Sequence, residues 1–140
     1  MVERLSRTTI DTILSDTGTG ILSLTNGTET YALPHSVGYD GDYLYFQFVA
    51  ADDSKKMRFI DTTEIATVTV FTETPSESVV ARGPLEEVPP DKHPHAAKAV
   101  AENATMPTFD IHPEKPLREL SMEFYRLEPV EITGQRFGHV

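Results

Sequence analysis

Three cationic side chains stand close together in a chain that is otherwise strongly acidic. Lys55, Lys56 and Arg58 lie within four residues, directly after an aromatic run, although the formal net charge of the 140 residues is -10. Phosphate oxygens accept charge-assisted hydrogen bonds from such side chains, and the backbone N–H groups at a helix start add to the attraction. Ser54 is a suitable helix cap, which places both lysines in a first turn, where the helix dipole disfavours cations. The pattern therefore predicts a bound phosphate group, with an ordinary solvated turn as the alternative.

The segment LPHSVG, residues 33–38, offers a second group of polar atoms. His35 and Ser36 are adjacent, and neighbouring residues of a strand point to opposite faces, so we expect no nucleophile–base pair here. Pro34 lacks an N–H group, which confines it to a sheet edge and leaves nearby backbone groups free to contact a ligand. The alternative is an edge strand with a partly exposed histidine.

Histidines at positions 93, 95 and 112 have a spacing that a transition metal could use. No cysteine is present anywhere in the chain, and no frame of carboxylates accompanies these imidazoles. The neighbouring prolines indicate a surface loop. We therefore expect no metal site.

The composition limits the classes of partner. A chain of 140 residues with 39% hydrophobic residues can form one core. With 22 acidic against 12 basic residues and a pI of about 4.8, it is a poor partner for nucleic acid. It has no apolar run long enough for a bilayer and no hydrophobic signal segment, so we expect a cytoplasmic protein without membrane partners. The acidic, threonine-rich composition also suggests adaptation to salt.

Hairpin signals dominate the first half of the chain. Ile10, Ile13 and Leu14 have helical spacing, with Gly18 as the expected end of that helix. The dipeptides Asn26-Gly27 and Asp40-Gly41 predict tight turns between strands. Six or seven strands with two or three short helices are expected in total, arranged as an antiparallel barrel. The later expected elements are two helical turns from residue 54, strands within 64–73 and 77–88, a helix over 95–103 and a final strand region within 121–137.

The order of these features resembles the pyridoxamine 5'-phosphate oxidase-like flavoproteins. The run YALPHSVGYDGDYLYFQF, the turn DSKKMRFI and the strands EIATVTVF and ESVVARGPLEEV follow one another as in that family. The resemblance implies a mainly β fold, a six-stranded antiparallel split β-barrel with two or three short helices, in a single domain over residues 1–140. It also implies FMN as the cofactor and a homodimer with the flavin at the subunit interface.

The resemblance further implies which residues line the cofactor. The strand 33–37 corresponds to the segment beside the flavin ring and ribityl chain, and residues 46–47 correspond to the next flavin-facing pair. Residues 54–56 correspond to the phosphate site, where lysine at 55 replaces an arginine and loses its bidentate fork. Ser78 falls where relatives often carry a polar residue that reaches the flavin. The implied cofactor-binding residues are Leu33, Pro34, His35, Ser36, Val37, Phe46, Gln47, Ser54, Lys55, Lys56 and Ser78.

The function implied is that of an FMN-dependent oxidoreductase acting on an unidentified small molecule. No dedicated acid or base stands out, which suits a flavoenzyme because the cofactor carries the electrons. Arg136 and Phe137 are candidates for contacts with the partner's site. The alternatives are a deazaflavin- or haem-binding barrel and a non-catalytic flavin-binding or sensor module.

Overall fold

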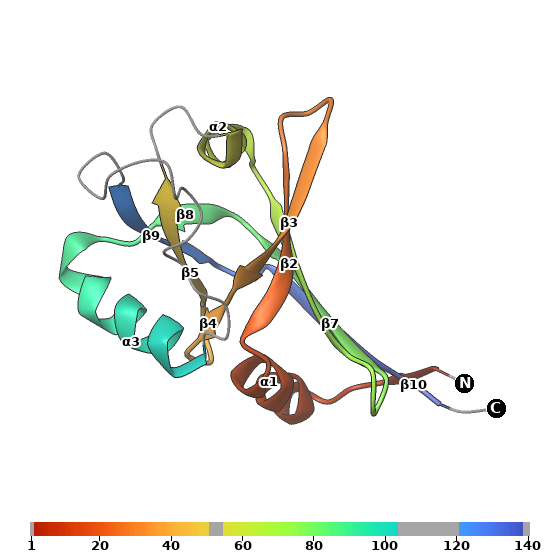
Figure 1. The fold of residues 1–140 in the computed structure, drawn as a ribbon. Helices are drawn as coiled ribbons and strands as arrows, with labels where there is room; N and C mark the ends of the chain where they lie inside the picture. The colour runs from red at the N-terminus through yellow and green to blue at the C-terminus, as the bar shows by residue number, and fades with distance from the viewer. Residues whose placement is uncertain (1, 51–54, 104–120, 139–140) are drawn as a thin grey trace.

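Two antiparallel sheets make up the protein in the computed structural model, which describes residues 2–50, 55–103 and 121–138 (Figure 1). The strands are β1 (Val2–Arg4), β2 (Thr19–Thr25), β3 (Thr30–Ser36), β4 (Gly38–Tyr39), β5 (Leu44–Ala50), β6 (Ala66–Thr72), β7 (Glu77–Gly83), β8 (Leu85–Glu87), β9 (Ser121–Leu127) and β10 (Glu131–Phe137). The helices are α1 (Arg7–Asp16), α2 (Lys55–Thr62) and α3 (His93–Asn103), with a 3-10 turn at Pro90–Lys92. The larger sheet has the order β1-β10-β7-β6-β2-β3, and the smaller has the order β4-β5-β9-β8.

The mainly β fold class predicted from the sequence is confirmed. The described residues form ten strands, more than the six or seven expected. The difference comes from β1, β4 and β8, which are only two or three residues long and carry no readable alternation.

Helix α1 begins at a side-chain cap and buries the face that the sequence predicted. The Ser6 hydroxyl accepts a hydrogen bond from the Thr9 N–H at 3.2 Å. Ile10, Ile13 and Leu14 are the buried residues of this helix. It ends at Asp16, two residues before the expected Gly18, and the Thr17 N–H donates to the Ile13 carbonyl at 2.9 Å.

Both predicted hairpin turns are confirmed. Gly27 and Gly41 have φ angles of 97° and 99°, a conformation that glycine adopts without steric strain. The Asn26 side-chain oxygen accepts from the N–H groups of Thr28 and Glu29, and the Asp40 carboxylate accepts from those of Asp42 and Tyr43. These contacts close the loops that join β2 to β3 and β4 to β5.

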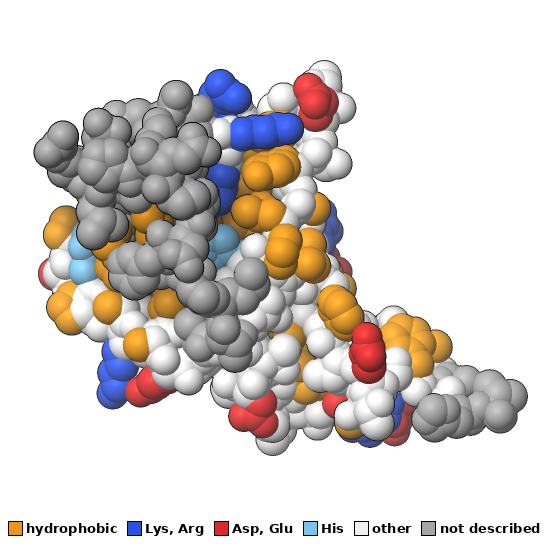
Figure 2. All heavy atoms as spheres, in the orientation of Figure 1, with side chains coloured by type: hydrophobic (Ala, Val, Ile, Leu, Met, Phe, Trp, Pro, Cys, Tyr) orange, Lys and Arg blue, Asp and Glu red, His pale blue; other side chains and the backbone are white. Residues whose placement is uncertain are grey.

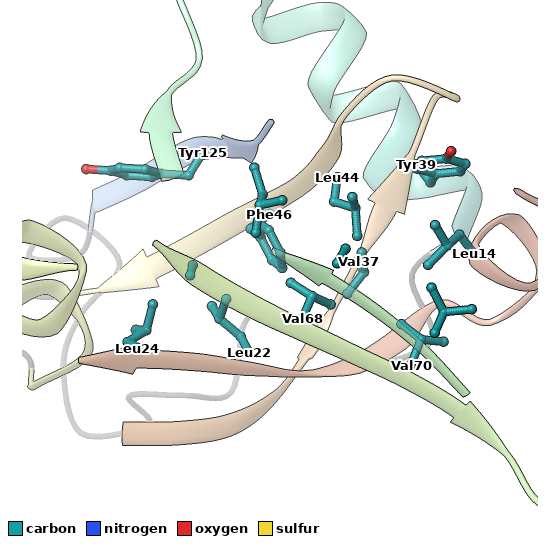
Figure 3. Packing of buried hydrophobic residues seen from close by; sticks show 14 of the residues in the cluster. Leu14, Leu22, Leu24, Val37, Tyr39, Leu44, Phe46, Val68, Val70 and Tyr125 are labelled. Atoms are coloured by element: carbon teal, nitrogen blue, oxygen red, sulfur yellow. The ribbon is translucent and has the colours of Figure 1, made fainter. Parts of the chain in front are cut away.

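The main core lies between the inward faces of the two sheets. Figure 3 shows Phe46 of the smaller sheet pointing toward Leu22 and Val68 of the larger one. All three side chains are at most 1% exposed. Burial of this apolar surface is the main stabilising contribution to the fold.

A second, smaller core joins α3 to the other face of the smaller sheet. Tyr45 packs there with Ala96, Ala99 and Val100 of the helix. Gly38 allows the close approach, because a Cβ atom at that position would lie 2.7 Å from both the Ala99 carbonyl carbon and the Val100 nitrogen. Helix α3 therefore depends on a residue without a side chain at this position.

We predict that Gly38→Ala lowers the free energy of unfolding by about 1–3 kcal/mol, the usual cost of inserting a methyl group into a packed site. Urea unfolding followed by circular dichroism measures the change. Lys98→Ala is the control on the same helix, because the Lys98 side chain is 75% exposed and its removal should change stability by no more than about 0.5 kcal/mol. A loss in Gly38→Ala no larger than that in Lys98→Ala would contradict the role of Gly38 in helix packing.

Candidate functional site

A buried histidine lies where the two sheets meet. The side chain of His35 on β3 is 5% exposed, and its ring contacts the rings of Phe46 and Phe48 edge-on, with centroid distances of 5.9 and 5.0 Å. Its Nδ1 lies 3.0 Å from the Ser36 carbonyl oxygen. The other ring nitrogen, Nε2, is buried and has no hydrogen-bond partner in the part of the chain that the structure describes.

A buried lysine shares the same aromatic surface. Lys56 on α2 is 6% exposed, and its Nζ lies 5.0 Å from the centroid of the Phe48 ring, a cation–π distance. No carboxylate pairs with it among the residues that the structure describes. Burial lowers the pKa of Lys56 from its usual value. The part of the chain that the structure describes therefore places a cation against the Phe48 ring and supplies no counter-charge for it.

Helix α2 is anchored so that this lysine points inward. The Thr63 hydroxyl, just beyond the helix, accepts from the Thr25 N–H at 3.0 Å and so ties the helix end to β2. Lys56, Phe59 and Ile60 form the buried face of the helix. The two helical turns predicted for this segment are confirmed by α2, which spans eight residues.

The other two cations of the cluster lie on the outside of α2. Lys55 and Arg58 are exposed, and the Lys55 Nζ lies 5.2 Å from the centroid of the Tyr31 ring. Lys and Arg side chains gather over this helix in Figure 2. A hollow of about 420 Å³ beside them is lined by Asn26, Glu29, Lys55, Arg58, Phe59 and Thr62. The cluster is therefore divided, with one lysine inward and two cations around an outer hollow.

The predicted residues on β3 alternate between two faces. Leu33 and His35 lie on one face of β3, and Pro34 and Ser36 lie on the opposite face. Val37, which follows the strand, is buried in the main core. The expected edge strand is confirmed, because β3 ends the larger sheet. The accompanying expectation of a partly exposed histidine is wrong, since β5 of the other sheet covers the ring.

Two further predicted residues, Gln47 and Ser78, stand apart from the pair of His35 and Lys56. Gln47 follows Phe46 on β5 and points to the face that carries Tyr45 rather than to the main core. Ser78 pairs with Phe71 and Gln135, on a strand that β6 and β2 separate from β3. Ser54 lies outside the described residues. The roles predicted for these residues stay predictions.

Phe48 is the residue that the sequence-based site omitted. Its ring contacts both His35 and Lys56, and it is fully buried. The available signal was its alternation with Phe46 along β5, which marks both as residues of one face.

Two of the histidines considered as metal ligands have partners within the protein. His93 Nε2 lies 3.0 Å from the Val88 carbonyl oxygen, and His95 Nε2 lies 2.8 Å from the Asp40 carboxylate. His112 lies outside the described residues. Within residues 2–50, 55–103 and 121–138, no group of three His, Cys, Asp or Glu side chains could hold a metal ion. In the same ranges no helix has the length and apolar character needed to cross a membrane.

Comparison with known protein families assigns the chain to one of them. The family model described as pyridoxamine 5'-phosphate oxidase matches residues 6–136, nearly the whole sequence. The chain belongs to the pyridoxamine 5'-phosphate oxidase-like family. No curated protein sequence matches this chain.

Solved structures of similar fold support the assignment and confirm the split barrel. A FAD-binding protein from Mesorhizobium loti superimposes with a TM-score of 0.76 at 20% identity, covering 99% of each chain. The FAD-binding protein from Mycobacterium smegmatis gives a TM-score of 0.72 at 17% identity, covering 99% of this chain and 100% of the other. A FAD- and haem-binding protein from the same organism gives 0.69 at 16% identity, covering 96% of this chain and 72% of the other.

The buried histidine of this pyridoxamine 5'-phosphate oxidase-like protein predicts a loss of stability in acid. Burial lowers the pKa of His35 from 6.5 to about 4 despite its bond to the Ser36 carbonyl, and the charge on Lys56 acts in the same direction. Between these pH values the unfolded chain binds a proton at His35 that the folded chain does not, so stability falls as the pH falls through this window. The loss is of the order of 3 kcal/mol.

Urea unfolding of the cofactor-free protein at a series of pH values measures this dependence. We expect His35→Phe to lose less stability than the wild type over the same window, because it has no proton to bind there. Other acidic groups titrate in both proteins, so only the difference between the two profiles reports on His35. Superimposable profiles would contradict the burial of an uncharged imidazole.

Proposed function

We propose that this chain is a flavoprotein that binds FMN and uses it in an oxidoreduction of a small molecule. The observation that carries the proposal is the pair of polar groups on the Phe48 ring: within the described residues, the buried His35 Nε2 has no hydrogen-bond partner and no carboxylate pairs with Lys56. Buried polar groups in folded proteins are nearly always satisfied, and an unpaired buried charge is strongly destabilising. A bound flavin would supply an acceptor oxygen for the ammonium group and an N–H or O–H donor for the imidazole nitrogen.

The chemical groups around the Phe48 ring fit a flavin. Its phosphate or ring oxygens would accept hydrogen bonds from Lys56, and the rings of Phe46 and Phe48, with centroids 5.9 Å apart and an interplanar angle of 5°, form the apolar core behind the two polar groups. The flavin, when bound, supplies the transfer of electrons or hydride. The protein's own contribution is to hold the cofactor, fix its orientation and exclude water from the site.

FAD is the alternative flavin, because two further cations lie around a hollow close to Lys56. The outer hollow beside Lys55 and Arg58 adjoins the helix that carries Lys56, so a second phosphate group would meet two further cations. Three of the similar structures are also named for FAD. Release of the cofactor by acid followed by mass spectrometry distinguishes FMN from FAD.

Haem is a candidate of a different class. An unprotonated imidazole nitrogen in an apolar wall is the type of group that ligates haem iron, and one similar structure is named for both FAD and haem. The visible spectrum of the purified protein separates flavin, deazaflavin and haem, and a colourless protein would indicate a module without any of these cofactors.

We predict that Lys56→Met removes the copurifying flavin while the apoprotein becomes more stable by about 1 kcal/mol or more. The substitution keeps the length and apolar contacts of the side chain and removes a charge that is buried without a partner. Absorbance of the purified protein measures flavin content, and urea unfolding measures stability.

Lys98→Met is the matched control for this experiment. Lys98 lies on α3, its side chain is 75% exposed, and its Nζ is 3.9 Å from the Glu102 carboxylate. We expect unchanged flavin content and a stability change within about 0.5 kcal/mol. Undiminished flavin in Lys56→Met, or a wild type that binds neither FMN nor FAD, would refute the proposal.

A homodimer is the proposed assembly, as is usual for barrels of this family. The outward face of the larger sheet would form the contact, since Phe71 is 54% exposed there and Ile21 and Val80 are only half-buried. Arg136 donates hydrogen bonds to Glu77 at 2.6 Å and Glu3 at 3.2 Å in its own chain, and its predicted contact with the partner stays a prediction.

We predict that Phe71→Glu converts the dimer to a monomer with a folded core. A charge in an apolar interface has no partner and opposes association, whereas the same residue on a free surface has little effect on folding. Sedimentation velocity measures the mass, and circular dichroism checks the fold. A wild type that sediments as a monomer would contradict the proposed assembly.

A further inference from the structure

We infer that His35 orients the bound flavin as a hydrogen-bond acceptor, receiving an N–H or O–H of the cofactor whose neighbouring oxygen contacts Lys56. This inference rests on the proposed function and deepens it, because it states which chemical group of the ligand faces each of the two protein atoms. The site would then recognise a donor and an oxygen acceptor side by side.

The role of Nε2 follows from the bond made by the other ring nitrogen. A carbonyl oxygen can only accept, so the 3.0 Å contact between Nδ1 and the Ser36 oxygen requires the proton to be on Nδ1. In the neutral imidazole the second nitrogen then carries a lone pair. Nε2 of His35 is therefore an acceptor, and among the described residues it is a buried atom without a hydrogen-bond partner.

The surroundings keep the imidazole in this state. The ring lies against Phe46 and Phe48, which offer no counter-charge to an imidazolium, and the ammonium group of Lys56 repels a second positive charge. Both effects hold the pKa of His35 well below neutrality. At neutral pH the site therefore presents one fixed acceptor and one cationic donor.

Two parts of a flavin carry a donor next to an oxygen. The ring has an N3–H group flanked by carbonyl oxygens, and the side chain has ribityl hydroxyls close to the phosphate. The chemistry shared by both is a donor within a few atoms of an acceptor oxygen. Lumiflavin, which keeps the ring and lacks the ribityl phosphate, distinguishes the two sources.

The test is fluorescence-quenching titration of FMN and of lumiflavin into cofactor-free wild type and His35→Phe. We expect His35→Phe to weaken FMN binding about tenfold, the effect of one lost hydrogen bond at a buried site. The same variant should be as stable as the wild type or more so at neutral pH, because phenylalanine fills the ring volume and removes an unsatisfied nitrogen. A residue with a purely structural role would give the opposite pattern, with lower stability and unchanged affinity.

His35→Gln serves as a rescue variant, since its side-chain oxygen is an acceptor of similar reach. We expect it to bind FMN more tightly than His35→Phe. His93→Phe is the matched control, because its Nε2 already has a partner in the Val88 carbonyl and the residue packs on Phe124, in the other core. It should lose stability and keep its affinity for FMN.

The outcomes separate this inference from the proposed function. A wild type that binds FMN with the same affinity as His35→Phe overturns the acceptor role while leaving the flavoprotein proposal standing. A wild type that binds no flavin overturns both. Weaker binding of lumiflavin by His35→Phe assigns the contact to the ring edge, and an effect confined to FMN assigns it to the ribityl and phosphate part.

Discussion

The ring of Phe48 is the surface on which the candidate site depends. The Phe48 centroid lies 5.0 Å from the centroid of the His35 ring and 5.0 Å from the Lys56 ammonium nitrogen, so one apolar side chain holds two polar groups in place. Burying polar groups costs free energy unless they find partners. A ligand that offered a partner to each group would recover part of that cost, and this is the physical basis of the proposed flavin site.

The topology of the sheets explains why these groups meet. The chain leaves the larger sheet at Ser36 and enters the smaller one at Gly38, so His35 stands at the change of direction and faces the strand that returns as β5. Helix α2 follows β5 in the chain and places Lys56 against the ring of Phe48, which also contacts His35. A site assembled in this way needs no long-range loop, because β3, β5 and α2 come within about thirty consecutive residues of the chain.

Local signals in the sequence predicted the hairpins, the short helix after β5 and the family. Asn26-Gly27 and Asp40-Gly41 specify turns through glycine and side-chain hydrogen bonds, which act within four residues. The inward orientation of Lys56 was also readable, since Lys56, Phe59, Ile60 and Thr63 follow the spacing of one helical face. The burial of His35 was not, because an edge strand is exposed unless a distant element covers it, and the cover comes from the other sheet.

The position of β3 at the end of the larger sheet has a consequence for solubility. An edge strand presents unpaired backbone groups to which a strand of another molecule can add, and such additions begin many aggregation reactions. Pro34 lies in the middle of this edge and has no amide hydrogen to offer, so a foreign strand cannot form a continuous ladder along it. The residue that flanks the buried imidazole therefore also opposes the addition of further strands at this edge of the sheet.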